Sequence, residues 1–293
     1  MLTRFTVLPA ALFLSLGCAR SNSAPSAEES TRATSLSAPS SSPGLPAGEG
    51  DAAERLRSSP RHGEWLMVAA GATDSVRAWV VYPERRDKAP VIVVVHEIFG
   101  LTPWIRAVAD QFAADGFVAI APDLLTGKNV QEGPDGPVRE SAVAAVRALD
   151  ADEVQRRLDF VAKHAMALPA AQPRYGIVGF CWGGSASFAH AVHSPSLGAS
   201  VVYYGSSPST DRLGTVRAPV LGLYGENDAR VNATVPPADS AMKALGKTFE
   251  HQFFTGAGHG FLRAQDGANG ANLAAAKGAW PRTIEWFRKH LES

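Results

Sequence analysis

The sequence predicts an α/β fold with a mostly parallel central sheet and helices on both faces. Short apolar runs alternate along the chain with segments whose apolar residues recur at helical spacing, a pattern typical of parallel sheets. One run, within Ala89–His96, contains five consecutive β-branched residues, as expected for a strand buried on both faces. Because ligands collect at the carboxyl ends of parallel strands, the residues that carry chemistry are expected just after strands.

The expected strands are short and apolar, and a Gly71–Asp74 turn joins the first two into a hairpin. In chain order they span residues 65–70, 76–82, 89–96, 117–121, 175–180, 199–204, 220–224 and 248–254.

Helices are expected where apolar residues recur at helical spacing. Pro103–Asp115 is the first, with Gly116 as its C-cap. Glu140–His164 is interpreted as one long helix, and Arg282–Leu291 as the last one. A further helix is expected to begin near Ser185.

The first 18 residues have the form of a secretory signal, with Arg4 at the start and an apolar run at Val7–Leu16. The run ends in Gly17-Cys18, which resembles the lipobox of bacterial lipoproteins, where the cysteine becomes the lipidated first residue. A plain secretory signal is the alternative, because Ser15 stands where that pattern prefers leucine. We expect an exported protein, periplasmic or membrane-anchored through a lipid on Cys18.

Residues 19–61 are rich in Ser, Ala, Pro, Gly and Glu, with few large apolar residues and no helical or strand period. Such a segment buries too little apolar surface to offset the entropy of ordering it. We therefore expect a disordered linker over 19–61, followed by one catalytic domain over 62–293.

Composition excludes several classes of partner. Lys plus Arg and Asp plus Glu number 28 each, so the formal net charge is zero, which argues against a nucleic-acid groove or a polybasic membrane patch. The two cysteines, Cys18 and Cys181, cannot form a disulfide framework or a zinc site. We expect a monomer that acts on a small molecule, without a cofactor or a metal.

Cys181 lies at the centre of a G-x-C-x-G pattern, between the strand ending at Phe180 and the following helix. This is the nucleophile-elbow pattern with Cys in place of Ser. The sharp turn strains the backbone of the nucleophile, and its neighbours must be glycines to avoid collision. A helix N-terminus under the sulfur favours thiolate over thiol. The alternative is a small buried cysteine in a glycine-rich turn.

A thiol nucleophile needs a base and a carboxylate that orients the base, in the chain order nucleophile, acid, histidine. Asp228 follows the strand at 220–224, and His259 lies in a glycine-flanked loop after the last strand. Glu226 is the rival for the acid; Asp228 is favoured because its later position in the loop better suits the reach to a histidine.

The loop after the 89–96 strand begins with His96-Glu97 and has glycine at position 100, so the second histidine of an H-E-x-x-H zinc motif is missing. This loop is instead expected to supply an oxyanion donor, the backbone N–H of Ile98. The N–H of Trp182, directly after the nucleophile, is the expected second donor.

Five motifs together resemble the dienelactone hydrolase family of the α/β-hydrolase superfamily. They are H-E-I-F-G, A-P-D-L, G-F-C-W-G-G, G-E-N-D and G-A-G-H-G-F, and the resemblance extends over residues 62–291. It implies an α/β-hydrolase fold and carboxymethylenebutenolidase-type cleavage of an ester or lactone.

The resemblance also implies site residues. It makes Cys181, Asp228 and His259 a triad, and gives Glu97 the role of contacting the thiol and helping to deprotonate it when substrate arrives. It implies that Arg263 binds a carboxylate of the substrate. The second carboxylate-binding arginine of the family has no counterpart in Pro122–Lys128, where Lys128 is the one candidate replacement.

Two other functions stay open at this point. One is acyl transfer or peptide cleavage at the same site. The other is a non-catalytic surface binding protein that has kept the fold.

Overall fold

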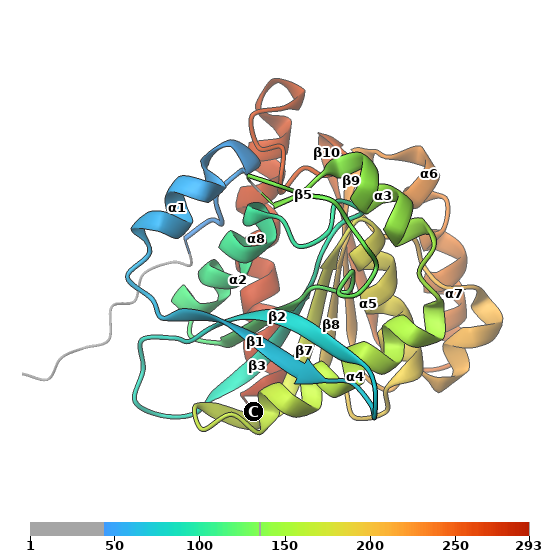
Figure 1. Cartoon of the computed structure of the whole chain (residues 1–293). Helices are drawn as coiled ribbons and strands as arrows, with labels where there is room; N and C mark the ends of the chain where they lie inside the picture. Colours follow the sequence, from blue (N-terminus) through green and yellow to red (C-terminus); the bar gives the residue numbers. More distant parts are fainter. Residues whose placement is uncertain (1–43, 135, 293) are drawn as a thin grey trace, which may run out of the picture. The chain divides into compact units, whose positions relative to one another are not determined.

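The computed structural model describes residues 44–134 and 136–292 (Figure 1). The predicted signal segment 1–18, Cys18 and the linker up to residue 43 lie outside the described residues. Eight strands of the described part form one sheet in the order β1-β2-β4-β3-β7-β8-β9-β10. β1 pairs antiparallel with β2, and β2 antiparallel with β4; all the other neighbours are parallel. The expected α/β fold with a mostly parallel sheet is confirmed.

The strands of the sheet agree closely with the expected runs. They are β1 (Gly63–Ala69), β2 (Ser75–Val81), β3 (Ala89–Val95), β4 (Val118–Pro122), β7 (Ala171–Phe180), β8 (Ala199–Tyr203), β9 (Val220–Asn227) and β10 (Phe249–Gly258). A small separate hairpin, which the sequence did not predict, pairs β5 (Glu132–Gly133) with β6 (Gly136–Pro137).

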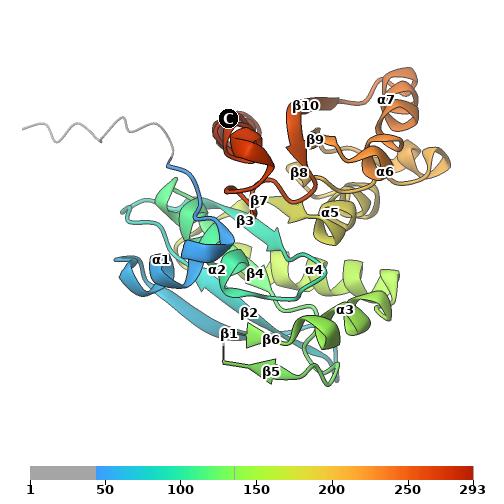
Figure 2. The ribbon, with the colours of Figure 1, turned by 90° about the horizontal axis from the view of Figure 1, so that it is seen from above.

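Helices cover both faces of the sheet (Figure 2). α2 (Pro103–Ala114) and α8 (Ala271–Leu291) pack on one face; α4 (Ala151–Met166), α5 (Trp182–His193) and α7 (Val235–Ala244) pack on the other. β3 is fully buried and shares its side chains between the two, with Ile92 and Val94 facing α2 and α8. This two-sided burial explains its uninterrupted β-branched run.

The expected single helix at 140–164 is wrong: it is two helices, α3 (Arg139–Arg147) and α4. Asp150 begins α4, because its side chain accepts a hydrogen bond of 2.9 Å from the N–H of Glu153. The apolar spacing continued across the break because both helices have buried faces. Val146 of α3 packs in a small cluster with Leu125, whereas α4 packs on the sheet.

The expectation of a disordered linker does not hold for residues 44–61. Residues Glu49–Asp51 form a short 3-10 helix and Ala52–Ser58 form α1, which lies beside α2 (Figures 1 and 2). Ala52 is buried, and Leu45 and Leu56 pack against the core.

Hydrogen bonds from the domain hold the backbone of this segment. Trp104 Nε1 donates to the Ala47 carbonyl at 3.1 Å, and Gln265 Nε2 donates to the Pro46 carbonyl at 2.9 Å. The average composition of the 43 residues of the expected linker concealed these few anchoring positions. Its backbone carbonyls accept hydrogen bonds from side chains far along the chain.

A matched pair of substitutions tests whether this segment contributes to stability. Ala52→Asp places a charge at a buried position and is expected to lower the free energy of unfolding by about 2 kcal/mol or more. Ala53→Asp adds the same charge one residue later at an exposed position and is expected to stay within about 0.5 kcal/mol. Urea denaturation measures both; equal midpoints would show that the segment contributes nothing.

Candidate active site

Cys181 occupies the turn between β7 and α5, with φ 57° and ψ −116°. A positive φ is uncommon for a residue with a side chain and persists only where the surroundings impose it. The Cys181 N–H donates to the Tyr203 carbonyl at 3.0 Å, which fixes the turn to the end of β8. The G-x-C-x-G pattern thus folds as a strand–turn–helix elbow.

The glycines around Cys181 are required by close backbone approach. A Cβ on Gly179 would lie 1.8 Å from the Gly183 carbonyl oxygen. A Cβ on Gly183 would lie 2.4 Å from the His96 carbonyl oxygen, and one on Gly184 would lie 2.5 Å from that of Tyr203. The start of α5 therefore packs directly against the ends of β3 and β8, with no room for side chains.

Asp228 and His259 form a direct pair at the same edge of the sheet. Asp228 follows β9, His259 follows β10, and the His259 Nδ1–H donates to Asp228 Oδ2 at 2.5 Å. The Asp228 side chain is buried and that of His259 is 34% exposed, so the imidazole keeps one open side. The ring of Tyr204 meets the imidazole edge-on, with ring centres 5.1 Å apart.

Glu226, the rival acid, has a different partner. It is exposed, and its Oε2 accepts a hydrogen bond of 2.9 Å from the N–H of Gly256. It braces the loop that leads to His259, whereas Asp228 contacts the imidazole itself.

The Cys181 thiol is protonated in this arrangement. Burial raises its pKa to about 11, and the negative charge of Glu97 adds to the effect. The N–H groups of Trp182 and Ile98 hydrogen-bond to the sulfur and act in the opposite direction, but they are outweighed. The start of the helix thus favours the thiolate, as expected, but burial and the Glu97 charge have the larger effect on the pKa of Cys181. Both expected oxyanion donors nevertheless face the sulfur.

Glu97, Arg263 and Glu49 form a row of alternating charges beside the thiol. Glu97 is almost fully buried, and its Oε2 lies 2.7 Å from Arg263 Nε in an ion pair. Arg263 Nη1 donates to Glu49 Oε2 at 2.6 Å, and Arg139 pairs with the other oxygen of Glu49. The ring of Phe99 lies beneath the guanidinium groups of Arg139 and Arg263, at 4.3 and 5.3 Å.

Burial raises the pKa of Glu97 to about 7, although Arg263 pulls it down. Glu49 contributes to the rise, because its negative charge lies on the far side of the same guanidinium. Glu97 therefore changes its protonation state at neutral pH, which suits a group that exchanges a proton during turnover.

Sequence reasoning missed Glu49 and Arg139. Glu49 lies in the segment interpreted as a linker, and Arg139 begins a helix whose position beside Arg263 no local pattern reveals. Lys128, the sequence candidate for a second cation, instead pairs with Glu153 at 2.8 Å. Arg139 is the cation that joins Arg263.

His96 holds the loop that carries Glu97 and Ile98. It is fully buried, and its Nδ1–H donates to the Glu97 carbonyl at 2.7 Å. Burial lowers its pKa, and its ring stacks on Trp182 with ring centres 5.5 Å apart. The Glu97 carbonyl and the Ile98 N–H belong to one planar peptide unit, so this bond also orients the donor that faces the sulfur.

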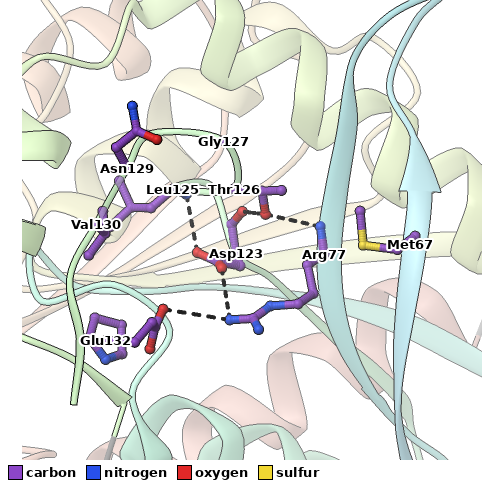
Figure 3. Close-up of a pocket in the computed structure, with 10 residues that line it drawn as sticks. Met67, Arg77, Asp123, Leu125, Thr126, Gly127, Asn129, Val130 and Glu132 are labelled. Carbon is purple, nitrogen blue, oxygen red and sulfur yellow. Dashed lines mark hydrogen bonds and ion pairs between the residues drawn. The ribbon is translucent and has the colours of Figure 1, made fainter.

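A cavity of about 340 Å³ is lined by residues of β1, β2 and the segment that follows β4 (Figure 3). One lining residue, Leu125, belongs to a small apolar cluster against which Ile98 and Trp182 pack. Some of its polar groups are paired with one another: Arg77 Nη2 donates to Asp123 Oδ2 at 3.3 Å, and the Arg77 N–H donates to Thr126 Oγ1 at 3.0 Å. The lining of this cavity includes none of the triad residues and neither oxyanion donor.

Within residues 44–134 and 136–292, no group of three or more His, Cys, Asp or Glu side chains is arranged to hold a metal ion. In the same described ranges, no helix has the length and apolar character needed to span a bilayer.

The raised thiol pKa predicts how the resting enzyme reacts with iodoacetamide. Only the thiolate reacts, so labelling of Cys181 is expected to be slow at pH 7 and to rise about tenfold per pH unit, without a plateau below pH 10. Unfolded protein, with an ordinary thiol pKa of about 8.5, serves as the control and levels off earlier. A plateau near pH 7 in the folded enzyme would contradict the description of a resting thiol.

Several known proteins similar to this chain belong to one family. The profile of the Dienelactone hydrolase family matches residues 76–291. A Salmonella typhimurium protein named "Putative carboxymethylenebutenolidase" is 33% identical over 264 residues, covering 84% of this chain and 96% of its own. The mouse "Carboxymethylenebutenolidase homolog" is 29% identical and covers 70% of this chain and 84% of its own.

Among solved structures, the dienelactone hydrolase of Anabaena variabilis has a TM-score of 0.61 at 23% identity, covering 79% of this chain and 99% of its own. That likeness concerns the fold. The profile match, which spans most of the described domain, and the Salmonella relative together identify this chain as a hydrolase of the dienelactone hydrolase family.

Proposed function

We propose that the protein hydrolyses a small ester or lactone through a Cys181–His259–Asp228 triad. The observation that carries the proposal is the 2.5 Å hydrogen bond between His259 and Asp228 at the sheet edge where the elbow presents Cys181. A carboxylate that orients a partly open imidazole, at the same sheet edge as a strained nucleophile, supports acyl transfer to that side chain.

The reaction proceeds through a thioester. The sulfur attacks the carbonyl carbon as the thiol proton passes to His259, and the N–H groups of Ile98 and Trp182 stabilise the oxygen that gains charge. The imidazolium gives its proton to the leaving alkoxide. His259 then takes a proton from water, the hydroxide cleaves the thioester, and the proton returns to sulfur with release of the acid.

Glu97 is proposed as a proton relay at the start of the reaction. A thiol with a pKa of about 11 needs help to ionise, and Glu97 is the carboxylate whose charge acts on it. Glu97 accepts the proton from the thiol and hands it on to the imidazole, so it ends the step ionised, as it began. Its pKa of about 7 lets Glu97 take up and release a proton near neutral pH.

Export is a separate proposal that rests on residues 1–18 of the sequence alone. Metabolic labelling with a palmitate analogue, with Cys18→Ser as the control, tests the lipid anchor. Labelling that persists in Cys18→Ser would contradict a lipid anchor on Cys18.

Substitutions of two acidic residues test the triad. Asp228→Asn leaves the imidazole without its orienting charge and is expected to lower kcat on 4-nitrophenyl esters by about 10⁴-fold. Glu226→Gln keeps an acceptor for Gly256 and is expected to stay within about threefold, since such surface changes are mild. Similar losses in the two variants would contradict the assignment of Asp228.

A separate experiment distinguishes hydrolysis from acyl transfer. The reaction is run with an added alcohol, and the products are analysed for the free acid and for a new ester of that alcohol.

The relay role predicts a pH dependence. Glu97 must be ionised to accept the thiol proton, so kcat/KM is expected to fall below pH 7 by about tenfold per unit as Glu97 becomes protonated. Glu97→Gln is expected to lower kcat/KM and to remove this acidic limb. A limb that stays unchanged in Glu97→Gln would assign it to another group and remove Glu97 from the proton path.

A further inference from the structure

We infer that Glu49 is a specificity-determining residue: its carboxylate fills an anion site formed by Arg263 and Arg139 and so directs the enzyme to esters without a carboxylate of their own. The inference rests on the proposed ester hydrolysis and adds a substrate class to it. Glu49, which excludes a carboxylate of the substrate, comes from this chain's own segment before β1.

Both oxygens of the Glu49 carboxylate are taken by guanidinium groups. Oε2 accepts a hydrogen bond of 2.6 Å from Arg263 Nη1, and Oε1 pairs with Arg139 Nη2. Two cations on one carboxylate make a complete anion-binding arrangement, in which charge-assisted hydrogen bonds are among the strongest in proteins. A second carboxylate finds these donors occupied.

The anion site adjoins the chemistry. The same Arg263 lies 2.7 Å from Glu97 through Nε, and the charge of Glu97 acts on the Cys181 thiol. A carboxylate bound by Arg263 and Arg139 would therefore lie beside the ion pair whose acid acts on the sulfur. This proximity makes Glu49 a determinant of what the nucleophile receives.

Glu49 is held firmly in this position. Its own N–H donates to the Arg263 carbonyl at 2.9 Å, so residue and guanidinium are joined through the backbone as well as the side chains. The preceding Ala47 and Pro46 carbonyls are bonded to the domain, and Ala52 anchors the following helix in the core. Glu49 loses its conformational freedom when the chain folds, so it binds the two arginines without a further entropy cost. A carboxylate from solution pays that cost and must also displace Glu49.

The charge balance points in the same direction. Glu97, Arg263, Glu49 and Arg139 carry two negative and two positive charges when ionised. A substrate carboxylate added to them leaves one uncompensated negative charge beside a buried one, which is unfavourable at partly desolvated sites. Without the Glu49 charge the group has one positive charge in excess and attracts an anion.

Glu49 also separates two cavities. One, of about 470 Å³, is lined by Glu49 and Arg139; the other, of about 410 Å³, is lined by Glu49 and Arg263. Glu49 is the residue that the two linings share. Shortening its side chain would give a small carboxylate access to both guanidinium groups at once.

Two esters of equal chain length test the inference: 4-nitrophenyl hexanoate and the mono-4-nitrophenyl ester of adipic acid, which differ by a terminal carboxylate. The wild type is expected to prefer the hexanoate. In Glu49→Ala the ratio of kcat/KM for the adipate ester to that for the hexanoate is expected to rise by about 10- to 100-fold, the value of a charge-assisted pair. Glu49→Gln, which keeps the size of the side chain, is expected to move the ratio the same way.

Glu54→Ala is the matched control, since it removes the same charge from an exposed position in the same segment. It is expected to leave the ratio and the hexanoate rate unchanged. Acetate added to Glu49→Ala is expected to refill the site and restore the wild-type preference.

The outcomes separate the two proposals. Turnover of the hexanoate with a ratio that neither Glu49 variant changes overturns the role of Glu49 and leaves the ester hydrolase standing. Absence of turnover of both esters by the wild type overturns the ester hydrolase, and the role of Glu49 with it. If the ratio rises equally in Glu54→Ala, the net charge of the protein, and not the position of Glu49, causes the change. That result also overturns the inference.

Discussion

The close packing of backbone on backbone around Cys181 is the constraint on which the rest of the site depends. The first turn of α5 touches the ends of β3 and β8 at distances that exclude a Cβ at Gly179, Gly183 and Gly184. That contact forces the positive φ of Cys181 and brings the N–H groups of Trp182 and Ile98 to its sulfur. Strain in the turn is offset by the sheet beneath it, whose central strand β3 is buried along its whole length.

The electrostatics of the site work against ionisation of the resting thiol. Burial and the Glu97 charge together outweigh two N–H donors, so the pKa of Cys181 is raised and its sulfur rests as a thiol. Such a thiol resists oxidation, because peroxide attacks the thiolate. The same carboxylate that holds the proton on sulfur has a pKa of about 7, so it can also carry that proton away.

The sequence predicted what depends on local pattern. Period and β-branched content located all the strands of the main sheet, and the glycine spacing located the elbow. It failed where the cause was a contact between distant residues. In the sequence, Asp150 has the character of a polar residue within one long helix. In the structure its side chain caps the start of α4 and divides the segment into two helices. Glu49 gained its role from Arg263, which follows it by more than 200 residues, and no compositional average records such a pairing.

The sign of the thiol pKa shift was also beyond local reasoning. The helix N-terminus was visible in the sequence, but the burial of Cys181 and its distance from Glu97 arise only when β3 and β7 pair. Long-range geometry thus decides the electrostatics, while local sequence decides the placement of the nucleophile.

The central claim is that Cys181 forms the covalent bond to substrate. The most direct measurement is peptide mass analysis of His259→Asn after acid quenching during reaction with 4-nitrophenyl hexanoate. In this variant Glu97 still accepts the thiol proton and 4-nitrophenolate leaves without one, but the base that activates water for thioester hydrolysis is missing. The account predicts a hexanoyl adduct on the peptide that carries Cys181. An adduct on another residue such as Ser185, with Cys181 unmodified and still alkylated by iodoacetamide after denaturation, would contradict it.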